Sequence, residues 1–287
     1  MPTDNYIEDA LHIKKFEEAL GSSPANVERK KIEVLFLDID GILTPSRGRP
    51  ADIRALAELV MLSKDPDSPK LAIFTGRQLP YLEAFCHILG IEVPSVCENG
   101  GIIFDPRSKE VIYNPKIKKE DLDMLSKLKK IISDKVLPKY PGAKIELGKE
   151  VTISINPPEH EDIKTFFHKF VNDRDIKDII GNKFSLTYSA SAIDISPPDI
   201  NKLDGVDYVL NELLHIDIKR VGAVGDAKND LIVLEKVGFS ATTSNGSDEV
   251  KRAVTYISNE PDARGTIDIL KKCIELNKKV FKRVTSQ

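Results

Sequence analysis

The chain has 287 residues, of which 41% are hydrophobic and 30% charged, and its formal net charge is -3. This length predicts two domains, or one domain that carries a large insertion, and the composition is that of an ordinary soluble globular protein. The small negative charge gives no electrostatic basis for binding nucleic acid or an anionic membrane surface.

The three cysteines, Cys86, Cys97 and Cys273, are scattered along the chain, and none lies in a CxxC pair. Their odd number and their spacing argue against a disulfide framework and against a structural zinc site. The sequence shows neither a signal peptide nor an apolar stretch long enough to cross a membrane. We therefore expect a cytoplasmic protein that is a monomer or a homodimer.

Residues 1–30 are predicted to form a helical arm, because apolar residues recur at near-helical spacing between Asn5 and Leu20. The arm contains no site signature, which favours a role in packing or in oligomer formation. It leads into residues 34–37, which form an unbroken apolar run. Such a run is too short for a helix and too evenly apolar for a half-exposed strand, so it predicts a buried parallel strand.

Two carboxylates, Asp38 and Asp40, follow this strand, and Gly41 ends it. In an open α/β sheet, ligands bind just beyond the carboxyl ends of the strands. Two like charges roughly 4 Å apart repel by about 4 kcal/mol at an effective dielectric constant near 20, so a cation should offset them. A hard cation such as Mg²⁺ suits this role, although an ordinary turn explains an isolated DxDG segment equally well.

A second buried strand is expected over residues 70–74, and it runs into Thr75, Gly76 and Arg77. A small turn at the end of a strand can direct a hydroxyl and backbone N–H groups at a phosphate. The alternative is that Thr75 only caps the helix that follows and extends to Leu89.

A short third strand expected at 95–97 completes a β-α-β-α-β order, which predicts an α/β fold with a doubly wound, Rossmann-like parallel sheet. Residues 102–104 and 111–113 are expected to form a β-hairpin. The pattern then changes to α-β-β-α-β-β, with a single helix expected over residues 161–176. This change indicates a second module inserted into the first. The predicted organisation is a helical arm at 1–30, a core domain at 31–113 and 194–287, and an inserted α+β cap domain at 114–193.

Polar residues on the expected strands of the insertion are candidates for contacting a substrate. Alternation along these strands does not say which of them face the core. The candidates are Glu146, Thr152, Ser154, Thr187 and Ser189.

Charged residues in two places follow the insertion. Lys202 precedes an apolar helix, and such a lysine is usually solvated unless its loop turns inward, where it can neutralise carboxylates and a bound phosphate. Residues 220–225 predict another buried strand, with Asp226 at its tip and Asp230 in the first turn of the next helix. This strand and the first one flank the switch point of a doubly wound sheet and should be neighbours. The two acidic pairs together predict a divalent-metal site.

Five motifs in this order resemble those of the haloacid dehalogenase (HAD) superfamily phosphatases, and the resemblance covers residues 31 to 287. The long insertion is similar to the type II α+β cap (subfamily IIB) found in archaeal-type phosphoglycolate phosphatases, sucrose-phosphate phosphatases and related sugar-phosphate phosphatases. Two departures are visible, namely Ile42 in place of the usual threonine, and Leu203 where a glycine normally follows the lysine. The motifs are DIDGILT from Asp38, TGR from Thr75, ENGG from Glu98, the lysine of DINKLDG, and GDAKND from Gly225.

The resemblance implies roles for these residues. Asp38 would be the nucleophile that forms an aspartyl-phosphate, and Asp40 would protonate the leaving alkoxide and later activate water. Thr75, Gly76 and Lys202 would hold the transferring phosphoryl group. Mg²⁺ would be held by Asp38, Asp40 (through its backbone carbonyl), Asp226 and Asp230, the last of these directly or through water.

The implied function is a Mg²⁺-dependent phosphomonoesterase that acts on a small phosphorylated metabolite, either a sugar phosphate or a phosphoglycolate-like compound. The cap would close over the site and read the leaving group. Two alternatives stay open. One is a phosphotransferase of the phosphomannomutase type, which shares the covalent intermediate, and the other is a non-catalytic binding or regulatory protein on the same fold.

Overall fold

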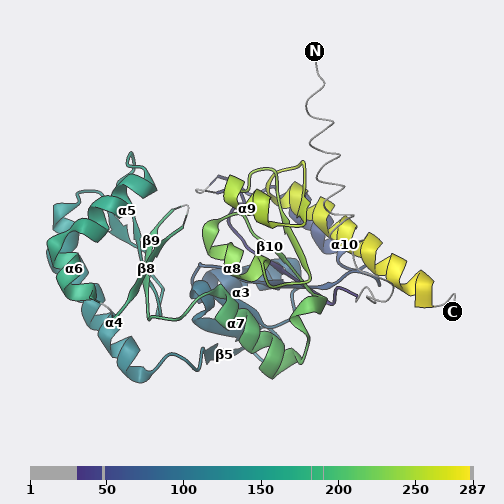
Figure 1. Cartoon of the computed structure of the whole chain (residues 1–287), viewed down its shortest axis with the longest axis horizontal. Coiled ribbons are helices and arrows are strands. Elements are labelled where there is room, and N and C mark those ends of the chain that lie inside the picture. Colours follow the sequence, from purple (N-terminus) through teal and green to yellow (C-terminus); the bar gives the residue numbers. More distant parts are fainter. Residues whose placement is uncertain (1–30, 47–48, 182, 190, 285–287) are drawn as a thin grey trace, which may run out of the picture.

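The computed structural model describes residues 31–46, 49–181, 183–189 and 191–284 (Figure 1). The expected helical arm at 1–30 lies outside the described residues. In Figure 1 a larger α/β part lies beside a smaller part, which consists of a β-sheet and the helices α4, α5 and α6.

A five-stranded parallel sheet forms the centre of the larger part, in the order β12-β11-β10-β1-β2. All four residues of β1 are buried, as expected of an unbroken apolar run. β1 pairs with β2 on one side and with β10 on the other, so the predicted contact between the first strand and the strand before Asp226 is confirmed. The strands are β1 (Val34–Leu37), β2 (Lys70–Ile73), β10 (Val221–Val224), β11 (Phe239–Thr242) and β12 (Tyr256–Ile257).

Helices cover both faces of this sheet. Leu35 and Leu37 of β1 pack in a core cluster with α2, α3 and α10, whereas Val34 and Phe36 pack with α7, α8 and α9. The predicted doubly wound α/β fold is therefore confirmed. The helices are α2 (Ile53–Leu62), α3 (Leu79–Leu89), α7 (Lys202–Tyr208), α8 (Leu231–Leu234), α9 (Asp248–Ala253) and α10 (Asp262–Val284).

A small antiparallel sheet continues from the end of β2. A parallel bridge joins Phe74 to Val96, and the backbone N–H of Thr75 donates to the Val96 carbonyl at 2.9 Å. The turn that follows β3 is thereby held beside Thr75. The strands of this sheet are β3 (Ser95–Cys97), β4 (Ile102–Asp105) and β5 (Glu110–Tyr113).

The smaller part, here called the cap, is a four-stranded sheet in the order β6-β7-β9-β8, covered by helices on the side away from the core (Figure 1). The single helix expected over residues 161–176 is two helices. Asp173, between them, has an extended backbone. Its side chain caps the start of α6 by accepting a hydrogen bond from the backbone N–H of Asp175. The elements are α4 (Lys119–Ile131), β6 (Lys144–Ile145), β7 (Ile153–Asn156), α5 (Ile163–Asn172), α6 (Arg174–Ile180), β8 (Ser185–Tyr188) and β9 (Ile193–Ser196).

Alternation gives β7 and β9 two different faces. Isoleucines on both strands pack against α4, α5 and α6, whereas Ser154 and Asp194, which lie opposite each other in the register, are on the other face. The expected boundary after residue 193 cuts through β9. Asp194 therefore belongs to the cap sheet through its strand pairing and not to the core.

Short 3₁₀ and π segments complete the fold. Two of them, η2 and η4, extend α4 and α7 with π-helical turns. Among the residues that the structure describes, no helix is both long enough and apolar enough to cross a membrane. These segments are η1 (Glu98–Gly100), η2 (Ile132–Val136), η3 (Leu137–Lys139), η4 (Val209–Leu214), η5 (Ile218–Arg220) and η6 (Lys228–Asp230).

Candidate active site

Three carboxylates meet at the carboxyl ends of β1 and β10. Asp38 follows β1, Asp226 follows β10 after one glycine, and Asp230 ends η6. One oxygen of each lies within 4.8 Å of the others. The parallel pairing of β1 with β10 produces this meeting, because parallel strands end at the same edge of a sheet.

A buried lysine lies between two of these carboxylates. The Lys202 ammonium is 3.0 Å from Asp38 Oδ2 and 2.6 Å from Asp230 Oδ1, and the side chain is 1% exposed. It also lies over the ring of Phe74, 4.8 Å from the ring centre. Asn201 caps the helix that carries Lys202, and its side chain accepts from the first backbone N–H groups of α7. The alternative interpretation of the sequence, in which Lys202 is exposed to solvent, is therefore wrong.

Burial shifts the protonation of this cluster. It raises the pKa of Asp38 to about 7, since a buried carboxylate is poorly solvated, and the attraction of Lys202 only partly offsets this. The pKa of Asp226 is raised well above its ordinary value by burial and by repulsion from Asp230 and Asp38. Burial acts to lower the pKa of Lys202, but attraction to Asp230 and Asp38 outweighs it and raises that pKa. One cation thus faces three carboxylates.

This cluster fits Mg²⁺. Magnesium prefers oxygen ligands, and a divalent cation would offset the negative charge that Lys202 leaves uncompensated. The loop after β1 approaches Asp226 so closely that a Cβ at Gly41 would lie 2.2 Å from Asp226 Oδ2. Gly41 also has a φ of +80°, a conformation that favours glycine. Only glycine therefore lets the DxDG loop come this close to the cluster.

The Asp40 carboxylate points away from the cluster and pairs with Arg77. Arg77 Nε donates to Asp40 Oδ2 at 2.6 Å, and Nη2 donates to Oδ1 at 2.7 Å. Hydrogen bonding to Asp40 raises the pKa of Arg77 above its ordinary value and outweighs the effect of burial, so this guanidinium stays charged. The bidentate geometry fixes the orientation of the Asp40 side chain in the pocket. Arg77 lies in the TGR motif, but the sequence does not predict this pairing.

Thr75 and Gly76 line the same pocket as Asp38 and Asp40. The alternative role of Thr75 as a helix cap is wrong, because α3 begins only at Leu79. Instead Thr75 Oγ1 accepts a hydrogen bond from the backbone N–H of Arg77 at 3.2 Å. The hydroxyl is thus held at the end of the strand, beside the nucleophile candidate.

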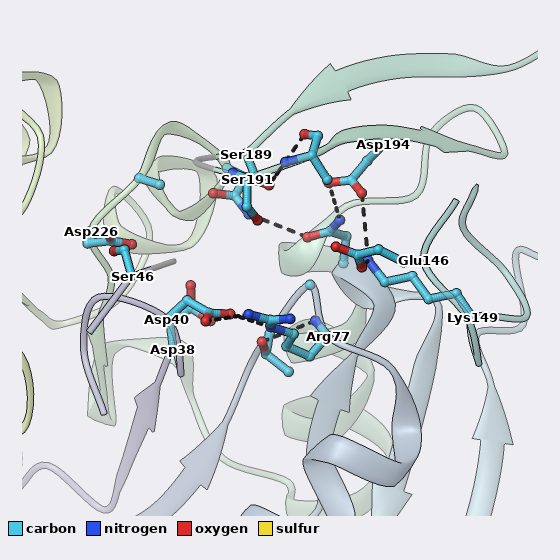
Figure 2. A pocket seen from close by; sticks show the side chains of 16 residues that line it. Asp38, Asp40, Ser46, Arg77, Glu146, Lys149, Ser189, Ser191, Asp194 and Asp226 are labelled. Atoms are coloured by element: carbon cyan, nitrogen blue, oxygen red, sulfur yellow. Dashed lines mark hydrogen bonds and ion pairs between the residues drawn. The ribbon is translucent and has the colours of Figure 1, made fainter. Parts of the chain in front are cut away.

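Residues of the cap line the opposite side of the pocket (Figure 2). The charged ones among them, here called the cap wall, are Glu146, Lys149 and Asp194. Lys149 Nζ lies 3.1 Å from Glu146 Oε2 and 3.7 Å from Asp194 Oδ1. It also donates to Ser154 Oγ, and Ser154 donates to Asp194.

Some of the substrate-contact candidates chosen from the sequence lie at the pocket, and others do not. Glu146 and Ser189 line the pocket, and Ser154 supports the cap wall from β7. Thr152 is buried and donates to the carbonyl of Glu98, while the exposed Thr187 is not among the lining residues. Sequence reasoning missed Lys149 and Asp194, which line the pocket, because neither belongs to a motif.

Glu98 fastens the cap loop to the core. Its carboxylate accepts backbone hydrogen bonds from Glu150, Val151 and Thr152, at distances between 2.8 and 3.1 Å. Both Glu98 and Asn99 have positive φ, of 47° and 54°, a conformation that is uncommon for residues other than glycine. The ENGG turn therefore holds the loop that carries Lys149 against the end of β3.

Known proteins resemble this chain over most of its length. The family model described as haloacid dehalogenase-like hydrolase matches residues 35–137 and 147–270. The phosphoglycolate phosphatase of Methanobrevibacter smithii is 25% identical over 248 residues, which cover 85% of this chain and 99% of the relative. That of Aeropyrum pernix is 25% identical over 251 residues, which cover 85% and 94%.

Solved structures share the fold. The Thermoplasma acidophilum protein 0175 matches with a TM-score of 0.66 and 21% identity, covering 86% of this chain and 99% of that one. The HAD subclass IIB sugar phosphatase BT4131 matches with a TM-score of 0.59 and 19% identity, covering 84% and 98%. The resemblance to HAD-type phosphatases, inferred from the motifs, is confirmed. The chain belongs to the haloacid dehalogenase-like hydrolase family.

Proposed function

We propose that the protein is a Mg²⁺-dependent phosphomonoesterase that acts on a small phosphorylated metabolite through an aspartyl-phosphate on Asp38. The observation that carries the proposal is the convergence of Asp38, Asp226 and Asp230 around the buried ammonium of Lys202. The names of the curated relatives, phosphoglycolate phosphatases, support a phosphate ester as substrate.

Asp38 is suited to the role of nucleophile. Its Oδ1 accepts from the backbone N–H of Ile39 at 2.8 Å, and its Oδ2 accepts from Lys202, so the carboxylate is held at the pocket floor in one orientation. A carboxylate oxygen of Asp38 would attack phosphorus, and the bond from phosphorus to the leaving oxygen would break. Lys202 would stabilise the negative charge of the transferring group.

Asp40 is placed to handle protons. It lines the pocket two residues after Asp38, and Arg77 holds it through two hydrogen bonds. In this proposal Asp40 protonates the leaving alkoxide and then takes a proton from the water that hydrolyses the aspartyl-phosphate. Thr75 and Gly76 would contact the phosphoryl oxygens from the end of β2.

The residues that would hold Mg²⁺ are Asp38, Asp226 and Asp230 through their carboxylates, and Asp40 through its backbone carbonyl. When bound, the ion would neutralise the charge of the phosphoryl group. The cap, which we delimit by its sheet as residues 114–196, would cover the pocket and exclude water during the reaction.

The test is the release of inorganic phosphate from a panel of phosphorylated metabolites, with Mg²⁺ and with EDTA. Hydrolysis that needs Mg²⁺ and is lost in Asp38→Asn supports the proposal. Transfer of phosphate to a second hydroxyl of the sugar, without release to water, would instead indicate the phosphomannomutase-type alternative. Failure to turn over any ester in the panel would favour a binding or regulatory protein.

A further inference from the structure

The cap wall and the reacting groups lie on opposite sides of one pocket. Figure 2 shows Asp38, Asp40 and Arg77 on one side, and Glu146, Lys149 and Asp194 across from them. A phosphate ester whose phosphorus lies next to Asp38 therefore directs its leaving group toward the cap wall. The chemistry of this wall decides which leaving groups it can accept.

The cap wall carries more negative than positive charge. Lys149 is its only cation among the described lining residues, and it is already close to the carboxylates of Glu146 and Asp194 and to the Ser154 hydroxyl. Lys149 thus donates to Ser154 and forms ion pairs with two carboxylates, so its single positive charge is already compensated within the cap wall. The second lining cation, Arg77, is occupied by Asp40.

The carboxylates of the cap wall keep capacity to accept hydrogen bonds. Glu146 accepts from Asn156 and faces Lys149, while Asp194 accepts from Ser154 and from Asn99 at 3.4 Å. An ionised carboxylate has about four lone-pair sites, so each can accept further bonds from a ligand hydroxyl. Burial raises the pKa of Asp194, which reflects how poorly this position tolerates negative charge.

From this arrangement we infer that Glu146 and Asp194 are specificity-determining residues, which select an uncharged leaving group rich in hydroxyls over one that carries a carboxylate. The inference rests on the proposed function and narrows it to polyol or sugar phosphates. The inference predicts that this protein disfavours phosphoglycolate, the compound in its relatives' names, because the glycolate leaving group carries a carboxylate.

The test compares glycerol 3-phosphate with 3-phosphoglycerate, which differ only in a hydroxymethyl group in place of a carboxylate. With Mg²⁺ present, we expect kcat/KM for glycerol 3-phosphate to be higher by about tenfold or more, the size of effect that one misplaced group causes in a binding pocket. Glu146→Gln removes one negative charge and keeps the shape, so it should narrow this ratio by at least about threefold.

Glu150→Gln is the matched control. Glu150 lies in the same loop, but its exposed carboxylate accepts from Tyr113 and is not among the lining residues. This variant should leave the ratio unchanged. A ratio at or below one, or a ratio that Glu146→Gln and Glu150→Gln change equally, overturns the inference.

A binding measurement separates this inference from the proposed function. Dissociation constants of the two compounds for the Asp38→Asn variant with Mg²⁺, which should not hydrolyse them, are measured by calorimetry and should show the same preference for glycerol 3-phosphate. If neither compound is hydrolysed but this preference persists and Glu146→Gln weakens it, the phosphatase proposal fails and the specificity inference stands. Equal binding of both, or binding of neither, overturns the inference.

Discussion

Replacement of Lys202 by methionine should destabilise the metal-free protein strongly. The side chain is 1% exposed and lies 2.6 Å from Asp230 Oδ1 and 3.0 Å from Asp38 Oδ2, so solvent does not screen these pairs. Removing one partner of a buried ion pair costs about 3–5 kcal/mol, because the other charge stays buried without compensation. Here two carboxylates lose their cation, so we expect the upper part of that range.

Magnesium should restore part of this loss. A cation bound by Asp38, Asp226 and Asp230 would offset the charge that Lys202 no longer compensates, so the variant should bind Mg²⁺ more tightly than the wild type does. Binding at 100 times the dissociation constant adds about 2.7 kcal/mol of stability. The assay is urea unfolding at pH 8, for wild type and variant, in EDTA and in Mg²⁺.

Lys149→Met is the matched control. Lys149 is also buried between two carboxylates, but these lie in the cap wall and outside the proposed metal site. The Lys149→Met substitution should lower the free energy of unfolding, and Mg²⁺ should not reverse this decrease. Equal stability of Lys202→Met and wild type in EDTA would refute the reasoning, and so would an equal Mg²⁺ effect on both lysine variants.

Three further outcomes test other parts of the structure. In EDTA, the free energy of unfolding should fall as the pH rises from about 4 to 7. In this window Asp38 binds more protons in the folded state, where its pKa is about 7, than in the unfolded chain, where aspartates titrate near 4. Urea midpoints that rise across this pH range would contradict the prediction. Arg77→Lys should lower kcat by about tenfold or more, because lysine cannot make the bidentate contact that orients Asp40; kinetics with the preferred substrate measure it, and an unchanged kcat removes the positioning role. Glu98→Gln should raise KM more than it lowers kcat, since the cap loop loses a charged acceptor for three backbone N–H groups while Asp38 and Asp40 stay in place; a fall in kcat alone would place the effect on the chemistry instead.

Much of the core follows from patterns that the sequence shows directly. The run at Val34–Leu37 predicts a buried strand because both faces of a parallel sheet are covered, and the structure buries all four residues. Asp38 and Asp226 come together because the carboxyl ends of parallel strands share one edge. Ile42, which departs from the family's usual threonine, is buried in the core, and its carbonyl accepts a hydrogen bond from Thr266.

The cap side of the pocket is harder to predict for a physical reason. Alternation on β7 and β9 separates the isoleucines from Ser154 and Asp194, but it does not say which face meets the core. Lys149 lies in a loop, where no periodicity applies, and its position depends on backbone N–H groups bound by Glu98. The pairing of Asp40 with Arg77 likewise depends on how the loop after β2 turns.

The two faces of the cap sheet have different neighbours. Ile153 and Ile195 pack against the helices of the cap, while Ser154 and Asp194 lie on the opposite face of the same strands. Substitutions on the face that carries Ser154 and Asp194 can therefore accumulate while the hydrophobic contacts of the other face stay in place. On the proposed function, such a cap can change its preferred metabolite during evolution while the residues at the ends of β1 and β10 stay the same.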